Sequence, residues 1–145
     1  MATLLERLSA VLAEVATVEE SDGALTVMQP GVVASLRVVD IAEGLEMVSL
    51  TQPLAWDLPL NAKVRERVSQ QASKTLLGTV ALVEKTVDVP ANGSSATSAT
   101  RRSAVKKSAD VLLRYNFPGG GLSDEALRTL ILMVLAAGAD VRAAL

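Results

Sequence analysis

Apolar residues recur at helical spacing in three segments, at the start, in the middle and at the end of the chain. The first helix is predicted from residue 4 to about residue 16, behind a capping box formed by Thr3 and Glu6. The second is predicted over 60–76, where an apolar residue recurs at every fourth position in a narrow stripe. The third begins after the cap residue Ser123, and Gly138 is the expected stop.

Between the first two helices the pattern changes to short β-branched runs separated by turn-forming residues. These runs predict strands over 24–29, 32–39 and 45–52, and Pro53 and Pro59 are expected to end this series. After the second helix, 79–89 and 109–117 are predicted to pair as two more strands. The pattern therefore predicts an α+β protein with an antiparallel sheet, in the order helix, three strands, helix, two strands, helix.

The segment 90–108 interrupts this pattern with small, polar and basic residues that show no hydrophobic periodicity. Such a composition cannot offset the entropy lost on ordering, so we expect a flexible basic loop at a hairpin tip. The whole chain of 145 residues has the length of one domain. We therefore expect a single domain over 1–145 with this loop inserted in it.

Composition argues against most catalytic chemistry, because the chain contains no histidine and no cysteine. Carboxylate pairs and lysines can still catalyse reactions, but nothing in their spacing selects such a pair here. We therefore interpret the chain as a protein that is not an enzyme and that carries no cofactor or metal. Polar residues interrupt the N-terminal apolar residues early, and no apolar run has the length of a membrane span, so a cytoplasmic location is expected.

Charge is distributed unevenly along the chain. Residues 1–60 contain two basic and nine acidic residues, a net charge of −7, whereas residues 61–145 carry a net charge of +5. Opposite charges on one small domain can steer a partner or a second subunit toward it. The alternative interpretation is an ordinary solvated surface.

The element order, the position of the long hairpin insertion and the apolar closing helix resemble the YbjN-like family, which is related to class I type III secretion chaperones. This resemblance covers nearly the whole chain and includes no catalytic motif. It implies a homodimer of α+β protomers that binds a client protein on apolar surface, with a regulatory or stress-linked role. It also implies that the middle helix makes dimer contacts, and the residues so placed are Leu60, Val64, Val68 and Ala72. The alternative is that these residues pack on their own sheet.

Two further sets of residues are candidates for partner binding. The first consists of large or adaptable apolar side chains of the kind that form peptide grooves, namely Met28, Met47, Trp56 and Leu132. Their commoner role is core filling. The second is the basic loop, with Arg101, Arg102, Lys106 and Lys107, which suits contact with phosphates but also keeps a loop solvated.

These observations lead to two hypotheses of different class. The first is a homodimeric, chaperone-like or adaptor module that captures a partner protein without catalysis. The second is a nucleic-acid accessory protein that uses the basic loop as a phosphate-contacting arm. A shortage of aromatic residues for base stacking weighs against the second, since the chain has one Trp, one Tyr and one Phe.

Overall fold

Three helices and one six-stranded sheet make up the part of this computed structural model that is described, residues 2–88 and 105–145. In chain order the elements are α1 (Leu4–Ala13), β1 (Thr17–Ser21), β2 (Ala24–Gln29), β3 (Val32–Ala42), β4 (Leu45–Pro59), α2 (Ala62–Lys74), β5 (Thr79–Asp88), β6 (Val105–Pro118) and α4 (Asp124–Ala143). The strands lie in the order β1-β2-β3-β4-β6-β5, and all neighbours are antiparallel. The predicted α+β class is confirmed. One strand, β1, was not among those predicted.

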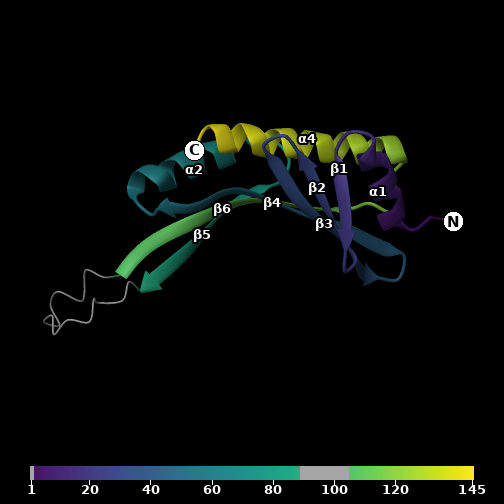
Figure 1. The fold of residues 1–145 in the computed structure, drawn as a ribbon, viewed down its shortest axis with the longest axis horizontal. Coiled ribbons are helices and arrows are strands. Elements are labelled where there is room, and N and C mark those ends of the chain that lie inside the picture. The colour runs from purple at the N-terminus through teal and green to yellow at the C-terminus, as the bar shows by residue number, and fades with distance from the viewer. Residues whose placement is uncertain (1, 89–104) are drawn as a thin grey trace, which may run out of the picture.

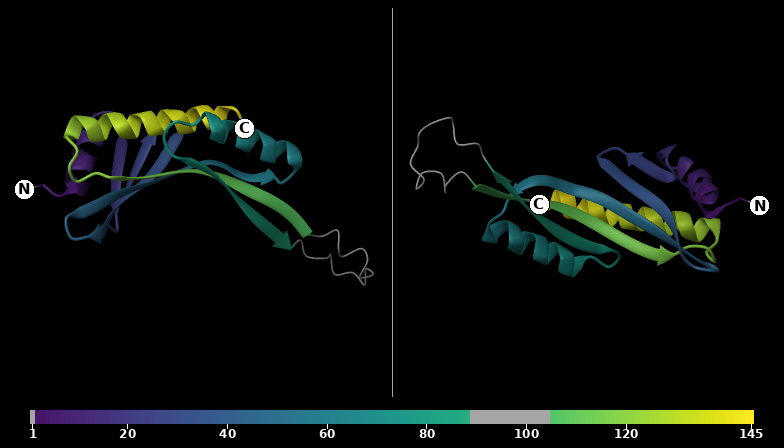
Figure 2. Two further views of the ribbon diagram at one scale, coloured as in Figure 1. Left: turned by 180° about the vertical axis from the view of Figure 1, so that it is seen from behind. Right: turned by 90° about the horizontal axis from the view of Figure 1, so that it is seen from below.

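All three helices lie on the same side of the sheet, which leaves the other side uncovered (Figures 1 and 2). We call these two sides the helix face and the open face. Strand β3 shows the alternation clearly, because Val32, Ala34 and Leu36 are buried while Val33 and Ser35 between them are exposed. An antiparallel sheet with one solvated face has this pattern. The core therefore lies in a single layer between the helices and the sheet.

Short side-chain caps set the start of each helix. The hydroxyl oxygens of Thr3 and Ser123 accept hydrogen bonds at 3.1 Å from the amide three residues later, as the sequence predicts. Asn61 caps α2 in the same way, with its Oδ1 at 2.9 Å from an amide nitrogen. Each bond satisfies one of the amide groups that a helix leaves without a partner at its N-terminus.

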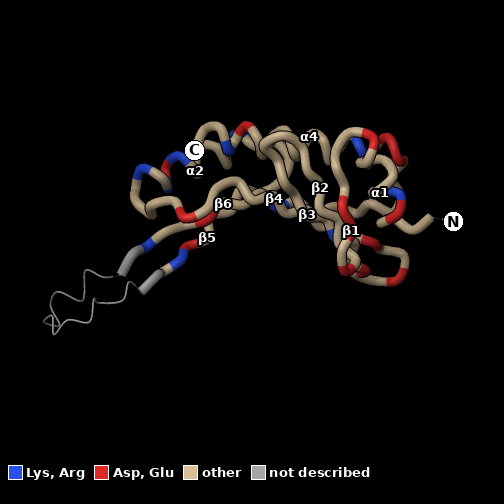
Figure 3. The backbone as a smooth tube through the Cα atoms, viewed as in Figure 1, with Lys and Arg blue, Asp and Glu red and all other residues tan. Residues whose placement is uncertain are grey.

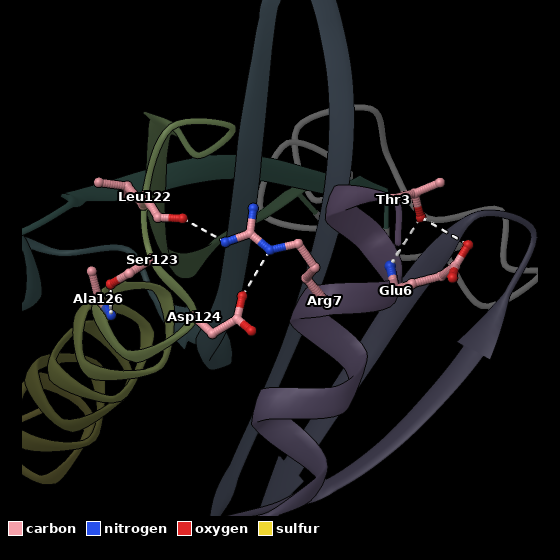
Figure 4. Close-up of polar contacts among 7 residues, drawn as sticks. All are labelled: Thr3, Glu6, Arg7, Leu122, Ser123, Asp124 and Ala126. Carbon is pink, nitrogen blue, oxygen red and sulfur yellow. Dashed lines mark hydrogen bonds and ion pairs between the residues drawn. The ribbon is translucent and has the colours of Figure 1, made fainter. Parts of the chain in front are cut away.

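Arg7 joins α1 to the start of α4 (Figure 4). Its Nε donates to Asp124 Oδ1 at 2.7 Å, and its Nη2 donates to the carbonyl oxygen of Leu122 at 2.5 Å. Asp124 lies in the first turn of α4, where a carboxylate also interacts favourably with the helix dipole. The two helices are thereby held together at the N-terminal end of α4.

Strand β4 continues past the expected stop at Pro53 and ends at Pro59. The register between β4 and β6 shifts twice, between Pro53 and Ala55 and again between Ala55 and Leu58. A proline cannot donate a ladder hydrogen bond, so it is tolerated next to such an irregularity. The prediction that Pro53 ends the strand is therefore wrong.

Gly138 is not a helix stop, because α4 continues through it to Ala143. It is buried, and a Cβ atom there would overlap the side-chain amide of Gln52 on β4. The glycine therefore lets α4 approach the sheet closely rather than ending the helix. Within the described residues, no helix combines the length and the apolar character that crossing a bilayer requires.

Candidate functional site

A groove with a volume of about 500 Å³ lies between the end of α2, the following loop and the second half of α4. Most of its walls are aliphatic, and charged side chains stand at its rim. The lining residues are Gln71, Lys74, Thr75, Leu76, Leu77, Met133, Ala136, Ala137, Asp140 and Val141. A groove with this lining offers aliphatic surface to an apolar side chain.

Two side chains of this groove are unusually exposed for their type. Leu76 is 86% exposed and Met133 is 48% exposed. Leu76 lies in the loop between α2 and β5, where Gly78 follows with a positive φ of 87°. A Cβ at Gly78 would crowd Leu113 and the carbonyl oxygen of Arg114, so the loop passes very close to β6 there. This close approach fixes the loop that carries Leu76.

The predicted dimer residues of the middle helix mostly face the protein's own core. Val68 is only 6% exposed, and Val64 is half-buried against the core. Leu60, which precedes the helix, and Ala72 are half-buried as well. The apolar stripe of α2 therefore covers β5, and the exposed sides of the helix are mainly basic and polar.

The four apolar residues considered for partner binding are not brought together. Met28 and Met47 are half-buried on different strands of the sheet, whereas Leu132 is half-buried on α4. Trp56 lies near the far end of β4 and is 61% exposed. These residues do not line one groove, and only Trp56 presents a large free surface.

Most of the predicted basic loop lies outside the described residues. This applies to Arg101 and Arg102, and also to the side chain of Lys106. Lys107 is described, and it is exposed on β6 beside the start of α2. Its carbonyl oxygen accepts a hydrogen bond from the amide of Leu60 at 3.3 Å.

A charged cluster that the sequence analysis missed occupies the open face where β4, β5 and β6 meet. The Lys85 ammonium lies 2.8 Å from Asp110 Oδ1 and 2.5 Å from Asp57 Oδ1. Asp110 is only 8% exposed, and its Oδ1 also accepts a hydrogen bond at 3.0 Å from the backbone amide of Asp57. The three residues lie far apart in sequence and become neighbours only through strand pairing, so spacing alone gave no signal.

The cluster shifts the protonation equilibria of its members in opposite directions. The hydrogen bond from Lys85, followed by the one from the Asp57 amide, lowers the pKa of Asp110 below its usual 3.8. Hydrogen bonds to Asp110 and then to Asp57 raise the pKa of Lys85 above 10.5. Both groups are therefore charged at neutral pH, and the lysine already occupies the place that a cation would take. Within the described residues no cluster of three or more metal-ligating side chains is present.

Neither a scan against protein-family models nor a search of curated proteins found a match.

Proposed function

We propose that this protein is a non-enzymatic, homodimeric binding module that captures another protein. The observation that carries the dimer is the groove between α2 and α4, beside which Leu76 stands 86% exposed. A two-fold axis near Leu76 would place this side chain of each copy against the groove of the other. Such an arrangement is self-complementary, as a two-fold interface requires.

The dimer proposed here uses a different surface from the one that the family resemblance implied. Val64 and Val68 already pack within the protomer, so they have little apolar area left to offer a second copy. Burying Leu76 and Met133 would remove exposed apolar area from water at about 25 cal/mol per Å². The apolar groove supplies the matching surface.

Two surfaces outside this groove support binding of a partner protein. Strand β5 is at the edge of the sheet, where one side of its backbone has no neighbouring strand among the described residues. The open face carries no helix (Figure 2). Sheet edges accept extended segments by backbone pairing, and uncovered faces accept partners through their side chains.

The dimer is tested by sedimentation velocity on the parent protein and on the variant Leu76→Ser. We expect the parent to sediment as a dimer and the variant as a monomer that keeps the parent's circular dichroism spectrum. Ile41→Ser is the matched control, because Ile41 is 60% exposed on the distant β3–β4 hairpin. A monomeric parent, or a variant that stays dimeric, would refute this interface.

Nucleic-acid binding is the second candidate, and the basic character of α2 favours it. Lys63, Arg67 and Lys74 are exposed on this helix, and Lys107 is exposed nearby on β6. Figure 3 shows mainly basic residues on α2 and residues of both signs on the neighbouring parts of β5 and β6. If this surface contacts phosphates, affinity for DNA or RNA falls steeply with salt, and replacing Lys63, Arg67, Lys74 and Lys107 together by alanine abolishes binding. Unchanged binding by that variant would remove this candidate.

A further inference from the structure

We propose that Trp56 and the open face beside it form the docking site for an acidic amphipathic helix of a partner protein. This inference rests on the partner-binding part of the proposed function and not on the dimer. It begins from an irregularity in β4 that holds a single tryptophan out in solvent.

The irregularity is a bulge opposite Asp110. Ala55 pairs with Val111 and Leu58 pairs with Ala109, so two residues of β4 face one residue of β6. The second of these two, Asp57, has a φ of 54°, in the left-handed region that residues other than glycine rarely adopt. A bulge of this kind redirects a side chain away from the regular pleat.

The charged cluster on the open face holds this bulge in place. The buried carboxylate of Asp110 binds the backbone amide of Asp57, and Lys85 connects the two carboxylates. Asp110 is only 8% exposed, so its carboxylate loses much of its hydration on folding, and the hydrogen bonds from Lys85 and from the Asp57 amide compensate for this loss. Strained backbone held by such contacts is common at binding sites.

The result is an exposed apolar surface around Trp56. Ala55 and Leu58 pair with the buried Val111 and Ala109 and pack against the core, whereas Trp56 lies in the bulge between them, opposite Asp110, which alternation along β6 places on the open face. It is 61% exposed, and Val83, which pairs with Asp110, is 39% exposed on the same open face. Leu112 and Ala81 pair with each other one step further along this face. Tryptophan is among the residues that most often dominate binding energy in protein interfaces.

The backbone of the sheet determines what kind of segment can cover this surface. Trp56 and its neighbours lie on the face of three paired strands, β4, β6 and β5, where the ladders between strands already use the backbone groups. An extended peptide placed on a face leaves its own amide and carbonyl groups without partners. A helix satisfies its backbone internally and offers an apolar stripe, so a helix is the occupant that suits this face.

The charge of the occupant follows from Arg114. This residue is exposed on the open face, paired with Thr79 on one side and Thr51 on the other, and it forms no ion pair within the described part of the chain. It lies four residues along β6 from Asp110, a distance of about 13 Å. Trp56 lies opposite Asp110, so a helix that covers Trp56 must extend a similar distance along β6 to reach Arg114. Two helical turns span about 11 Å, and a carboxylate side chain two turns from the residue on Trp56 would therefore reach the Arg114 guanidinium. The partner helix is therefore acidic at that position.

The test uses the fluorescence of Trp56, which is the only tryptophan of the chain. The probes are two synthetic amphipathic peptides, stapled as helices of about four turns, with the same leucine stripe and either glutamate or lysine flanking it. We expect the glutamate peptide to shift the emission of Trp56 to shorter wavelength and to bind about tenfold more tightly than the lysine peptide. Arg114→Gln should abolish this preference. Arg37→Gln, on the same face but on β3, should keep it.

Three outcomes would overturn the proposal. The first is an emission that neither peptide changes, and the second is equal affinity for the two peptides. The third is a blue shift that follows protein concentration without peptide, because a second copy would then be the occupant. The peptide titration is repeated with Leu76→Ser to separate this site from the dimer interface. If the variant is monomeric and still binds the peptide, the docking site is supported independently of the proposed dimer.

Discussion

At the scale of single residues, the contact between Gln52 and Gly138 determines how closely α4 packs on the sheet. Gln52 is only 2% exposed, and its Nε2 donates to the carbonyl oxygen of Leu135 across 3.4 Å. Its Oε1 is buried and has no hydrogen-bond partner among the described residues. Since there is no room for a Cβ between helix and strand here, the glycine is a packing requirement.

Gly138→Ala is therefore expected to destabilise the protein although alanine favours helices. Overpacking of this kind costs about 1–3 kcal/mol, more than the gain of about 1 kcal/mol in helix propensity. Urea unfolding at equilibrium measures the difference. Gly121→Ala is the control, because nothing lies within 4 Å of a Cβ at that position and its φ is not in the left-handed region. A Gly138→Ala protein as stable as the parent would show that the helix can shift away from Gln52.

The carboxylate of Asp110 is expected to make stability depend on pH at the acidic end. Because its pKa is lowered below 3.8 in the folded protein, its contribution is fully present above 3.8 and is lost as the pH falls through the folded pKa. The raised pKa of Lys85 acts in the opposite direction, so its contribution is present below pH 10.5 and is lost as the pH rises through the folded pKa.

The variant Asp110→Asn isolates the acidic effect. We expect it to be less stable than the parent at neutral pH, with a difference that shrinks as the pH falls below 3.8 and through the lowered pKa of the folded protein, because the parent's own carboxylate then becomes protonated. Urea unfolding at a series of pH values measures this convergence. Asp40→Asn, at an exposed position on β3, should differ from the parent by a small amount at every pH. If the difference in unfolding free energy between Asp110→Asn and the parent did not change with pH, the charge of Asp110 would not be what stabilises the protein.

At the scale of elements, the sequence predicted the parts whose signals are local. Helical periodicity together with the caps Thr3 and Ser123 placed α1 and α4 correctly at their starts, and turn residues separated β2, β3 and β4. The errors arose where contacts distant in sequence override a local rule. Pro53 was expected to end a strand, yet pairing with β6 extends β4 across the proline.

The candidate sites were less predictable than the elements for the same reason. Trp56 was selected because of its size, but the bulge that exposes it depends on Asp110, which lies in a strand more than 50 residues away. Alternation along β4 puts Gln52 on the helix face, although its polarity alone would suggest an exposed position. The groove beside Leu76 depends on how α2 and α4 are placed, and no pattern within either segment encodes that placement.

At the scale of the whole molecule, the uneven charge of the sequence becomes a difference between two ends. Acidic residues gather around α1, β1 and the β3–β4 hairpin, whereas basic residues predominate on α2 at the other end (Figure 3). The groove that carries Leu76 lies between α2 and the C-terminal half of α4, and so at the basic end. A two-fold dimer through Leu76 therefore brings two basic ends together.

This geometry predicts that salt strengthens the dimer. Helix α2 contains four basic residues and one acidic residue, and Lys74 lies only two positions from Leu76. Asp140 on the groove rim offsets part of this charge, but the exposed Lys63 and Arg67 still add repulsion. Raising the ionic strength from about 0.05 M to about 0.5 M shortens the screening length from about 14 Å to about 4 Å, so the repulsion falls. Sedimentation equilibrium should show a dissociation constant that decreases several-fold over this range.

The double variant Lys63→Gln, Lys74→Gln provides the control, because it removes like charges from each side of the proposed interface. It should dimerise more tightly than the parent at low salt and respond less to added salt. A dimer that instead weakens as salt rises would indicate attraction between unlike surfaces, with the acidic end of one copy on the basic end of the next. Such a head-to-tail contact need not close on itself and would form rings or chains rather than pairs. The sign of the salt effect therefore distinguishes a two-fold interface at Leu76 from an assembly governed by the charge of the two ends.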